Sequence, residues 1–399
     1  MGKGWDSMKQ NKVIICAMVL LLAACGGEAP GGAEIRITPV GQEESISCGN
    51  GFAVSERMEA DYRDIYMEME LRGPEHLEVI RSMVKWLGEN GYAAVDIGNQ
   101  TDMVCPEQMR EFCGQVEAGE EADAALIVVM SGIRLVQYGF RAKDGKVEVL
   151  RSHYRYREGC WENTDTQTYT ADTWVYSEEG YLFFGERHMP GFDGPSEHVA
   201  VRVEPLDEKC RGFNRKYLGW VGYGLNNLFT SDWSEEDFRE LNFYDLYAVL
   251  RQNLCQMENA FYKEGITYEI PESEFESVFQ SFFRVDSKVL RQYTVYHEDT
   301  QTYRYRERGM FDFAPTPEIP YPEVVSYEEN RDGTVKLTVN AVWPEECREK
   351  AFCHEVVIRP LEDGGFQYVS NHVIPSGDNV EITWYTERLD AAKWQEYYG

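Results

Sequence analysis

The sequence predicts an α+β fold with two domains, each built from one or more helices followed by an antiparallel β-meander. Three observations support this prediction. Apolar residues recur at helical spacing around residues 77–87 and 275–283, strand-like runs follow each helical region one after another, and Asp-Gly or Glu-Gly pairs separate many of these runs. Because consecutive strands with short turns pair antiparallel, alternating βα units are not expected. At 399 residues the chain exceeds one ordinary core, which favours two domains.

The first element is an export signal at residues 1–24. Lys9 and Lys12 precede an apolar run at 13–22, which is far shorter than the ~20 residues that span a bilayer as a helix. The run ends in Leu-Ala-Ala-Cys at 22–25, the lipobox pattern of a bacterial lipoprotein. We therefore expect cleavage before Cys25, lipidation of Cys25, and a protein held at the cell membrane that faces outside the cytoplasm. The alternative is an ordinary signal peptide cleaved after a small-residue site, with Cys25 incidental.

An N-terminal α+β domain is expected at 46–209, after a flexible, glycine-rich tether at 25–45. Residues 54–72, rich in Glu, Met, Tyr and Arg, predict a helix. A second helix follows, and a third is expected from Pro106 to about residue 117, after a short strand at 93–97. The second helix has one apolar face, formed by Leu77, Ile80, Val84 and Leu87.

From residue 124 the pattern changes to that of strands, which we expect to form the meander of this domain. Asp144-Gly145 and Glu179-Gly180 are hairpin turn sequences between them. The expected strands are 125–130, 135–141, 146–156, 169–176, 181–188 and 199–203.

An aromatic, glycine-rich loop and a helical connector at 210–270 lead to a C-terminal α+β domain at 271–399. Ser234, with Asp237 three residues later, predicts a helix start, and Ser273 with Glu276 predicts a capping box. The second of these helices has a strongly apolar face, formed by Phe275, Val278, Phe279, Phe282 and Phe283. Strands are expected at 295–306, 323–328, 335–342, 354–360 and 366–374. This order is similar in outline to cystatin-like and nuclear-transport-factor-like folds, an analogy that carries no function.

The chain is strongly acidic, with 69 Asp and Glu against 39 Lys and Arg and a net charge of −30. Nucleic acid is therefore not an expected partner, because its phosphates would be repelled at long range. Divalent cations or basic partners would be attracted. We expect the charge mainly to keep an exported protein soluble.

Eight cysteines remain after Cys16, which lies in the signal, and Cys25. An even number outside the cytoplasm permits disulfides, with buried free thiols as the alternative in a reducing host. No C-x-x-C occurs, so neither redox nor zinc-knuckle spacing is present. Sequence spacing suggests three pairs: Cys105–Cys113, Cys347–Cys353 and Cys160–Cys210.

The loop at 210–233 mixes Gly, Asn and aromatic residues and is one candidate binding site. Its rings and amides would suit a sugar or a peptide, since flat rings cover C–H faces and amides bind hydroxyls. The alternative is that the rings are buried in packing between the domains. The candidate ligand-binding residues are Trp220, Tyr223, Asn226, Asn227 and Trp233.

A second candidate site is the Gly- and Pro-rich loop at 185–198. Its side chains could bind a cation or perform acid–base chemistry, although no ligand spacing rule is met. The alternative is a solvated connection between strands. The candidate residues are Glu186, His188, Asp193, Glu197 and His198.

Four features together resemble uncharacterised lipoproteins of clostridial-type Gram-positive bacteria that are classed as a domain of unknown function. They are the lipobox, the Gly-Tyr-Gly-Leu-Asn-Asn-Leu-Phe stretch at 222–229 with Asp-Trp at 232–233, the Phe-rich helix at 273–283, and Asp-Gly-Gly-Phe-Gln-Tyr-Val-Ser-Asn at 363–371. The resemblance would cover most of the mature chain. It implies a location in the envelope and supplies no catalytic residue.

The expected function is that of a lipid-anchored, non-enzymatic binding or interaction module of the cell envelope, without a cofactor and with an unknown ligand or protein partner. No H-E-x-x-H, G-x-S-x-G or Walker A sequence occurs, which favours binding over catalysis. The alternative is an envelope hydrolase or metal-dependent enzyme that uses the 185–198 loop. A substrate-binding lipoprotein of an importer fits less well, because such proteins have alternating βα units.

Overall fold

The computed structural model describes residues 45–46, 54–73, 76–132, 134–157, 160–186, 198–255, 266–309, 312 and 318–389. All of these belong to one compact unit, Thr38–Gly399, while the unit Met1–Ile37 lies outside the described residues. The predicted signal segment, Cys25 and the tether up to residue 44 therefore remain predictions. The two-domain division is likewise still a prediction.

The α+β class is confirmed. After the short β1 (Ser45–Ile46) and β2 (Val54–Ser55), the N-terminal part begins with α1 (Glu56–Arg72) and α2 (Leu77–Glu89). A five-stranded sheet follows in the order β3-β4-β5-β6-β7, and all its neighbours are antiparallel except β3 and β4, which are parallel. Its elements are β3 (Ala94–Asp96), α3 (Pro106–Glu117), β4 (Ala122–Met130), β5 (Arg134–Lys143), β6 (Lys146–Arg157) and β7 (Cys160–Thr170).

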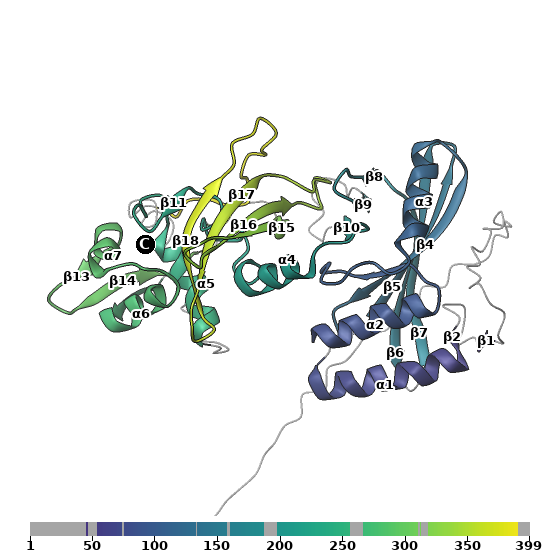
Figure 1. The fold of residues 1–399 in the computed structure, drawn as a ribbon, viewed down its shortest axis with the longest axis horizontal. Helices are drawn as coiled ribbons and strands as arrows, with labels where there is room; N and C mark the ends of the chain where they lie inside the picture. Colours follow the sequence, from purple (N-terminus) through teal and green to yellow (C-terminus); the bar gives the residue numbers. More distant parts are fainter. Residues whose placement is uncertain are drawn as a thin grey trace, which may run out of the picture. The chain divides into compact units, whose positions relative to one another are not determined.

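Alternation along β4 explains how both faces of this sheet are covered. Ile127 and Val129 join a core with α1 and α2, whereas Leu126 and Val128 join a second core with α3. Figure 1 shows α1 and α2 running across the strands of the sheet. A strand covered on both faces reads as a continuous apolar run, which is the sequence pattern from Ala125 to Met130.

A three-stranded sheet in the order β10-β9-β8 packs against the α3 side of the first sheet. Leu182 and Phe184 of β9 join that core, while Tyr181 and Phe183 join a separate cluster with Val342 from the C-terminal half. Every residue of β9 is therefore buried. The strands are β8 (Thr173–Tyr176), β9 (Tyr181–Gly185) and β10 (Val199–Arg202).

The C-terminal part contains a five-stranded antiparallel sheet in the order β11-β18-β17-β16-β15 and a smaller sheet in the order β12-β14-β13. Its helices are α4 (Glu208–Phe213), the π-helix η1 (Asn214–Leu218), α5 (Phe243–Cys255), α6 (Glu272–Phe282) and α7 (Ser287–Tyr293). Its strands are β11 (Trp233–Ser234), β12 (Thr267–Pro271), β13 (Tyr296–His297), β14 (Thr302–Arg306), β15 (Tyr321–Glu329), β16 (Val335–Val342), β17 (Cys353–Pro360) and β18 (Phe366–Val373). One large, aromatic-rich core connects these elements.

Asp245 of α5 holds the end of the described chain. Its side chain is fully buried, and its carboxylate accepts two hydrogen bonds from Arg308, both at 2.7 Å. Arg388 Nε donates to it at 2.7 Å and the Tyr385 hydroxyl at 2.9 Å. Arg308 also donates to the carbonyl of Thr386 at 2.7 Å. This cluster ties residues 385–388 to α5 and to the segment after β14.

Most predicted elements are confirmed, with boundaries that differ by a few residues. The Asp144-Gly145 turn has positive φ at both residues, as a tight hairpin requires. The apolar face of α6 is buried as predicted. In α2, Val84 and Leu87 are buried, but the buried side also holds Val79, Met83 and Trp86, while Leu77 and Ile80 are only half-buried.

Four expectations about elements were wrong. Residues 295–306 are not one strand but the two antiparallel strands β13 and β14. Residues 169–176 are not one strand but the end of β7 and all of β8. Most of β7 was not predicted, because this edge strand is mostly polar and exposed. Ser234 belongs to β11, and the next helix starts at Phe243, where Asn242 accepts hydrogen bonds from the amides of residues 244 and 245. The expected capping box is not formed in α6, because Glu276 binds Tyr303 and Ser287 instead. The elements α4, η1, α7 and β12 were not predicted.

The three expected disulfides are also wrong. Cys105, Cys113, Cys210 and Cys353 are free thiols, so none of the pairs Cys105–Cys113, Cys160–Cys210 and Cys347–Cys353 is formed. Burial raises the pKa of Cys113 to about 12 and of Cys210 to about 11, which disfavours the reactive thiolate. Cys113 and Cys210 instead pack as small apolar residues, the alternative for a reducing host.

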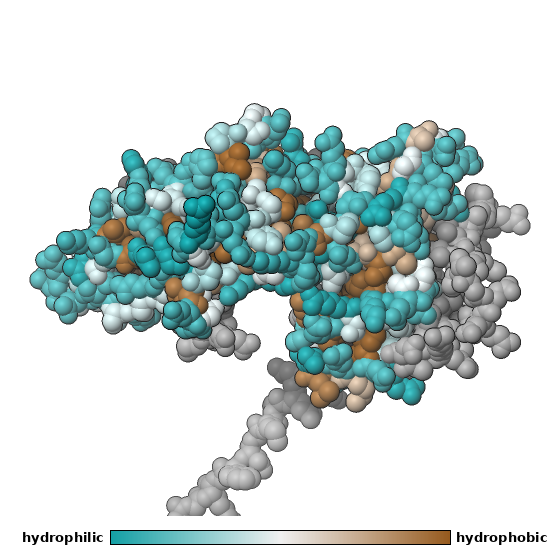
Figure 2. Space-filling model, viewed as in Figure 1, coloured by the Kyte–Doolittle hydropathy of each residue, from teal (hydrophilic) through white to brown (hydrophobic). Residues whose placement is uncertain are grey.

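The surface agrees with the charge of the chain. On the face shown in Figure 2, hydrophilic residues cover most of the described surface and apolar residues form small, separate groups. In the part of the chain that the structure describes, no helix has the length and apolar character needed to cross a membrane.

Candidate ligand-binding pocket

A pocket of about 250 Å³ lies where four segments meet: the loop after β3, the strand β9, the α4–η1 segment and the start of β15. Its apolar lining consists of Ile97, Leu206, Pro322 and Val324. Hydrogen-bonding side chains make up much of the rest, among them Asn99, Gln100, Arg211, Asn214, Tyr321 and Glu323. A small pocket with both kinds of lining is typical of a ligand site.

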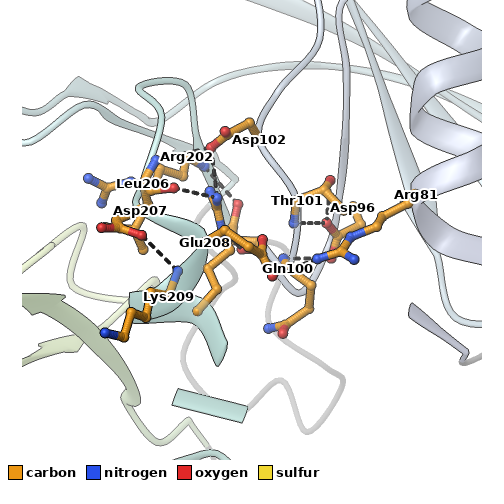
Figure 3. Close-up of polar contacts among 12 residues, drawn as sticks. Arg81, Asp96, Gln100, Thr101, Asp102, Arg202, Leu206, Asp207, Glu208 and Lys209 are labelled. Carbon is orange, nitrogen blue, oxygen red and sulfur yellow. Dashed lines mark hydrogen bonds and ion pairs between the residues drawn. The ribbon is translucent and has the colours of Figure 1, made fainter. Parts of the chain in front are cut away.

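The loop after β3 is held in shape by Asp96, a buried side chain that is 3% exposed. Its carboxylate accepts hydrogen bonds from the amides of Gln100 at 3.0 Å and Thr101 at 2.9 Å, and from the Thr101 hydroxyl at 2.9 Å. Figure 3 shows Asp96 enclosed by this loop. The loop turns back at Asn99, whose φ of +50° lies in the left-handed region that asparagine tolerates. Asp96 thereby fixes where Asn99 and Gln100 face.

Asn99 connects the loop to three other segments. Its Oδ1 accepts a hydrogen bond from the Arg202 amide at 2.8 Å, and its Nδ2 donates to the Ala200 carbonyl at 3.1 Å and the Tyr321 hydroxyl at 3.3 Å. Its backbone carbonyl accepts from Arg211 Nε at 3.0 Å. These bonds connect the loop after β3 with β10, α4 and β15 around the pocket.

Arg211 is 4% exposed and only partly satisfied. Its Nη1 donates to the Leu206 carbonyl at 2.8 Å and pairs with Asp102 Oδ1 at 2.7 Å. Its Nη2 is buried and has no hydrogen-bond partner among the described residues, and the same is true of Asn214 Oδ1. Because a buried donor or acceptor without a partner costs free energy, these two atoms are the places where a hydrogen bond to a ligand or water gains most.

Glu323 is the buried carboxylate of the pocket. Its Oε2 pairs with Arg202 Nη1 at 2.7 Å, and its Oε1 accepts from the Tyr181 hydroxyl at 2.7 Å. Burial raises the pKa of Glu323, and Arg202 opposes that shift by favouring the charged form. Burial also raises the pKa of Tyr181 and Tyr321, so both hydroxyls stay protonated and able to donate.

A second group of charges lies beside the pocket. The carboxylate of Glu208 accepts hydrogen bonds from Arg81 and Arg215, both at 2.5 Å, and Arg215 Nη1 lies 3.5 Å from Gln100 Oε1. Figure 3 shows Arg81 reaching across to Glu208. These groups are more exposed than Arg211, so their ion pairs are screened by solvent and contribute less.

The expected aromatic platform is not formed as an open surface. Tyr223 and Trp233 are buried in the large C-terminal core, and Trp220 packs against Phe282 with ring centroids 5.3 Å apart. Asn226 and Asn227 use their amides to hold the loop: Asn226 accepts from the Leu228 amide at 3.0 Å, and Asn227 accepts from the Asn242 amide at 3.0 Å. Since the side-chain amides already have internal partners, we assign these five residues to packing within the C-terminal core. The alternative interpretation of the sequence had expected the rings to pack between the two domains.

The carboxylate and histidine loop is only partly described. Glu186 and His198 are half-buried, while His188, Asp193 and Glu197 lie outside the described residues. Within the described ranges, no group of three or more His, Cys, Asp and Glu side chains could hold a metal ion. The expectation of a metal site in this loop is therefore neither confirmed nor contradicted.

A buried polar chain lies elsewhere, in the C-terminal core. The imidazole of His354 lies between the Tyr223 hydroxyl, 3.0 Å from Nε2, and Asn371 Oδ1, 2.6 Å from Nδ1. Burial lowers the pKa of His354 to about 4, so the ring is neutral at pH 7. In that state Nδ1–H donates to Asn371 and Nε2 accepts from Tyr223. The chain connects the 219–231 loop to β17 and β18.

Few of the residues that line the pocket could be recognised from the sequence. Asp96 followed by Asn, Gln and Thr at 99–101 is a turn-forming sequence that could have been recognised. Arg211 and Glu323 carry no such pattern, because each reads as an ordinary charged residue on an amphipathic element. They are more than 100 positions apart, and only the tertiary fold brings them to one pocket.

Comparison with known proteins finds one family model that matches the chain, over residues 51–388. It is described as a family of unknown function, DUF6070. No curated protein and no solved structure is similar enough to this chain to count as a match.

Proposed function

This chain belongs to DUF6070, a family of unknown function, and from that premise we propose that it is a lipid-anchored protein outside the cytoplasm. We propose further that it is a non-enzymatic binding module of the cell envelope, with the pocket around Asn99 and Arg211 as its ligand site. The family match itself supplies no activity. The proposal rests on the lipobox for location and on the pocket for binding.

The observation that carries the binding proposal is the preformed network around an incompletely satisfied arginine. Asn99 is held by hydrogen bonds to three other segments, and Arg211 Nη2 has no partner among the described residues.

Location is tested by replacing the lipobox cysteine. We expect radiolabelled palmitate fed to the producing cells to appear on the wild-type protein and not on Cys25→Ser, because only the thiol can form the thioether to lipid. The wild type should fractionate with membranes and be digested by protease added to intact cells. As a control, Cys16→Ser should keep the label, since Cys16 lies inside the removed signal. An unlabelled wild type found in the cytosol would refute the proposed location.

Binding is tested with a variant that fills the pocket. Gly219 lines the pocket, and a Cβ there would approach no closer than 3.4 Å to the Asn214 carbonyl, so Gly219→Leu should fold while occupying the cavity. We expect small molecules released from denatured wild-type protein, purified from its own cells, to be absent from Gly219→Leu when both are analysed by mass spectrometry. Gly377→Leu is the matched control, because a Cβ at this exposed glycine meets no atom within 4 Å. Equal release from all three proteins would contradict the proposed binding site.

A further inference from the structure

We propose that the pocket binds a small zwitterion, namely a free α-amino acid with an aliphatic side chain. This inference rests on the proposed binding function and deepens it by naming the ligand class. In the assigned arrangement Arg211 binds the carboxylate of the ligand, Glu323 binds its ammonium group, and the apolar lining residues pack against its side chain.

Opposite charges line one small cavity. Arg211 and Glu323 both line the pocket and are 4% and 7% exposed. Arg211 is close enough to lower the pKa of Glu323, although burial outweighs it. A zwitterion places a negative and a positive end in such a site without adding net charge, which avoids the cost of burying an uncompensated ion. It also enters without repulsion from a chain of net charge −30.

Arg211 and Glu323 both have unused hydrogen-bonding capacity. Arg211 Nη2 has no partner among the described residues, so its N–H groups are available to a carboxylate. Because Nη2 is buried, the Arg211 side chain must shift toward the cavity as the ligand enters. Among the described residues, Glu323 Oε1 accepts one hydrogen bond from Tyr181 and Oε2 accepts one from Arg202, whereas a carboxylate can accept about four. An ammonium group can therefore be added without breaking the ion pair to Arg202.

The cavity is small and is lined in part by apolar residues. A volume of about 250 Å³ lies below the roughly 300–1,000 Å³ of drug-sized ligand sites, which favours a small ligand such as a single amino acid. Ile97, Leu206, Pro322 and Val324 line the cavity with apolar side chains. An aliphatic side chain would gain from burial against these residues.

The test uses three probes that differ by one charged group. L-valine carries both charges, isovalerate is valine without the ammonium group, and isobutylamine is valine without the carboxylate. We expect isothermal titration of the full processed chain to show binding of L-valine, with each fragment at least about tenfold weaker, because each loses charge-assisted hydrogen bonds. Isovalerate binding as tightly as L-valine would overturn the zwitterion assignment, as would the absence of L-valine binding.

Variants locate the site of binding. Glu323→Gln keeps the shape of the side chain and, measured where its circular dichroism matches that of the wild type, should weaken L-valine binding at least about tenfold while leaving isovalerate binding unchanged. Glu329→Gln is the matched control on the same strand, since Glu329 is exposed and pairs with Lys209 outside the pocket lining. Equal loss of both ligands in Glu323→Gln, or equal effects of the two variants, would overturn the assigned role of Glu323.

The failure of this inference and of the proposed function can be told apart. If wild-type protein releases a sugar or another neutral molecule that Gly219→Leu does not release, the pocket is a binding site but the amino-acid assignment is wrong. If neither protein releases a small molecule and L-valine does not bind, both are wrong. Release of an aliphatic amino acid from the wild type alone supports both.

Discussion

Replacing Asp245 by alanine should cost about 3–5 kcal/mol of the free energy of unfolding, the largest effect we expect from a single substitution. Asp245 is fully buried and accepts hydrogen bonds from Arg308, Arg388 and Tyr385. Its removal leaves two guanidinium groups that are 5% and 10% exposed without their carboxylate. Because total stabilities are about 5–15 kcal/mol, the variant should unfold at a much lower urea concentration or fail to accumulate.

The control for this prediction is a surface pair of the same kind. Asp237 binds Arg239, but both side chains are exposed, so Asp237→Ala should change the urea midpoint little. Protease digestion gives a second readout, because Asp245→Ala should expose residues 385–388 that the cluster holds in place. If Asp245→Ala and Asp237→Ala have equal urea midpoints, the buried cluster does not stabilise the fold as we describe.

Replacing Arg202 by methionine should also cost about 3–5 kcal/mol near neutral pH, and this cost should depend on pH. Arg202 is 6% exposed and is the ion-pair partner of Glu323, so the variant leaves a buried carboxylate without its counter-charge. Burial already raises the pKa of Glu323, and losing Arg202 should raise it further.

The sign of the pH effect follows from this raised pKa. A carboxyl group whose pKa is higher in the folded state holds its proton more tightly when folded, so ionisation works against folding. Below the unfolded pKa of about 4.3 the group is protonated in both states and the penalty is absent. As pH rises through the folded pKa, stability is lost. The difference between wild type and Arg202→Met should therefore be smaller at pH 5 than at pH 8.

Urea unfolding at the two pH values measures this difference directly. Lys209→Met is the control, because Lys209 pairs with Glu329 on the surface and its loss should have a small effect at both pH values. A difference between Arg202→Met and wild type that is the same at pH 5 and pH 8 would show that Glu323 does not titrate as an unpaired buried group.

Local sequence determined most of the elements, because their causes lie within a few residues. The apolar spacing of Phe275, Phe279 and Phe282 required one buried helix face, and Asp144-Gly145 required a tight turn between two strands. Prediction from local sequence failed where a segment lacks such a pattern. The edge strand β7 is mostly exposed, so its polar residues show no alternation, and Ser234 carries a capping pattern that strand pairing with β18 overrides.

The sequence by itself also determined the predictions of export and lipidation, since a lipobox is read from contiguous residues, and it determined the acidity of the whole chain. Only the tertiary structure decided which polar residues are functional candidates. Tyr223 and Trp233 suggested a binding surface but are buried, whereas Asn99, Arg211 and Glu323 looked ordinary and line a pocket. The physical reason is that a binding site depends on which side chains converge after burial and on which of their hydrogen bonds remain unmade, and both depend on contacts between residues far apart in the chain.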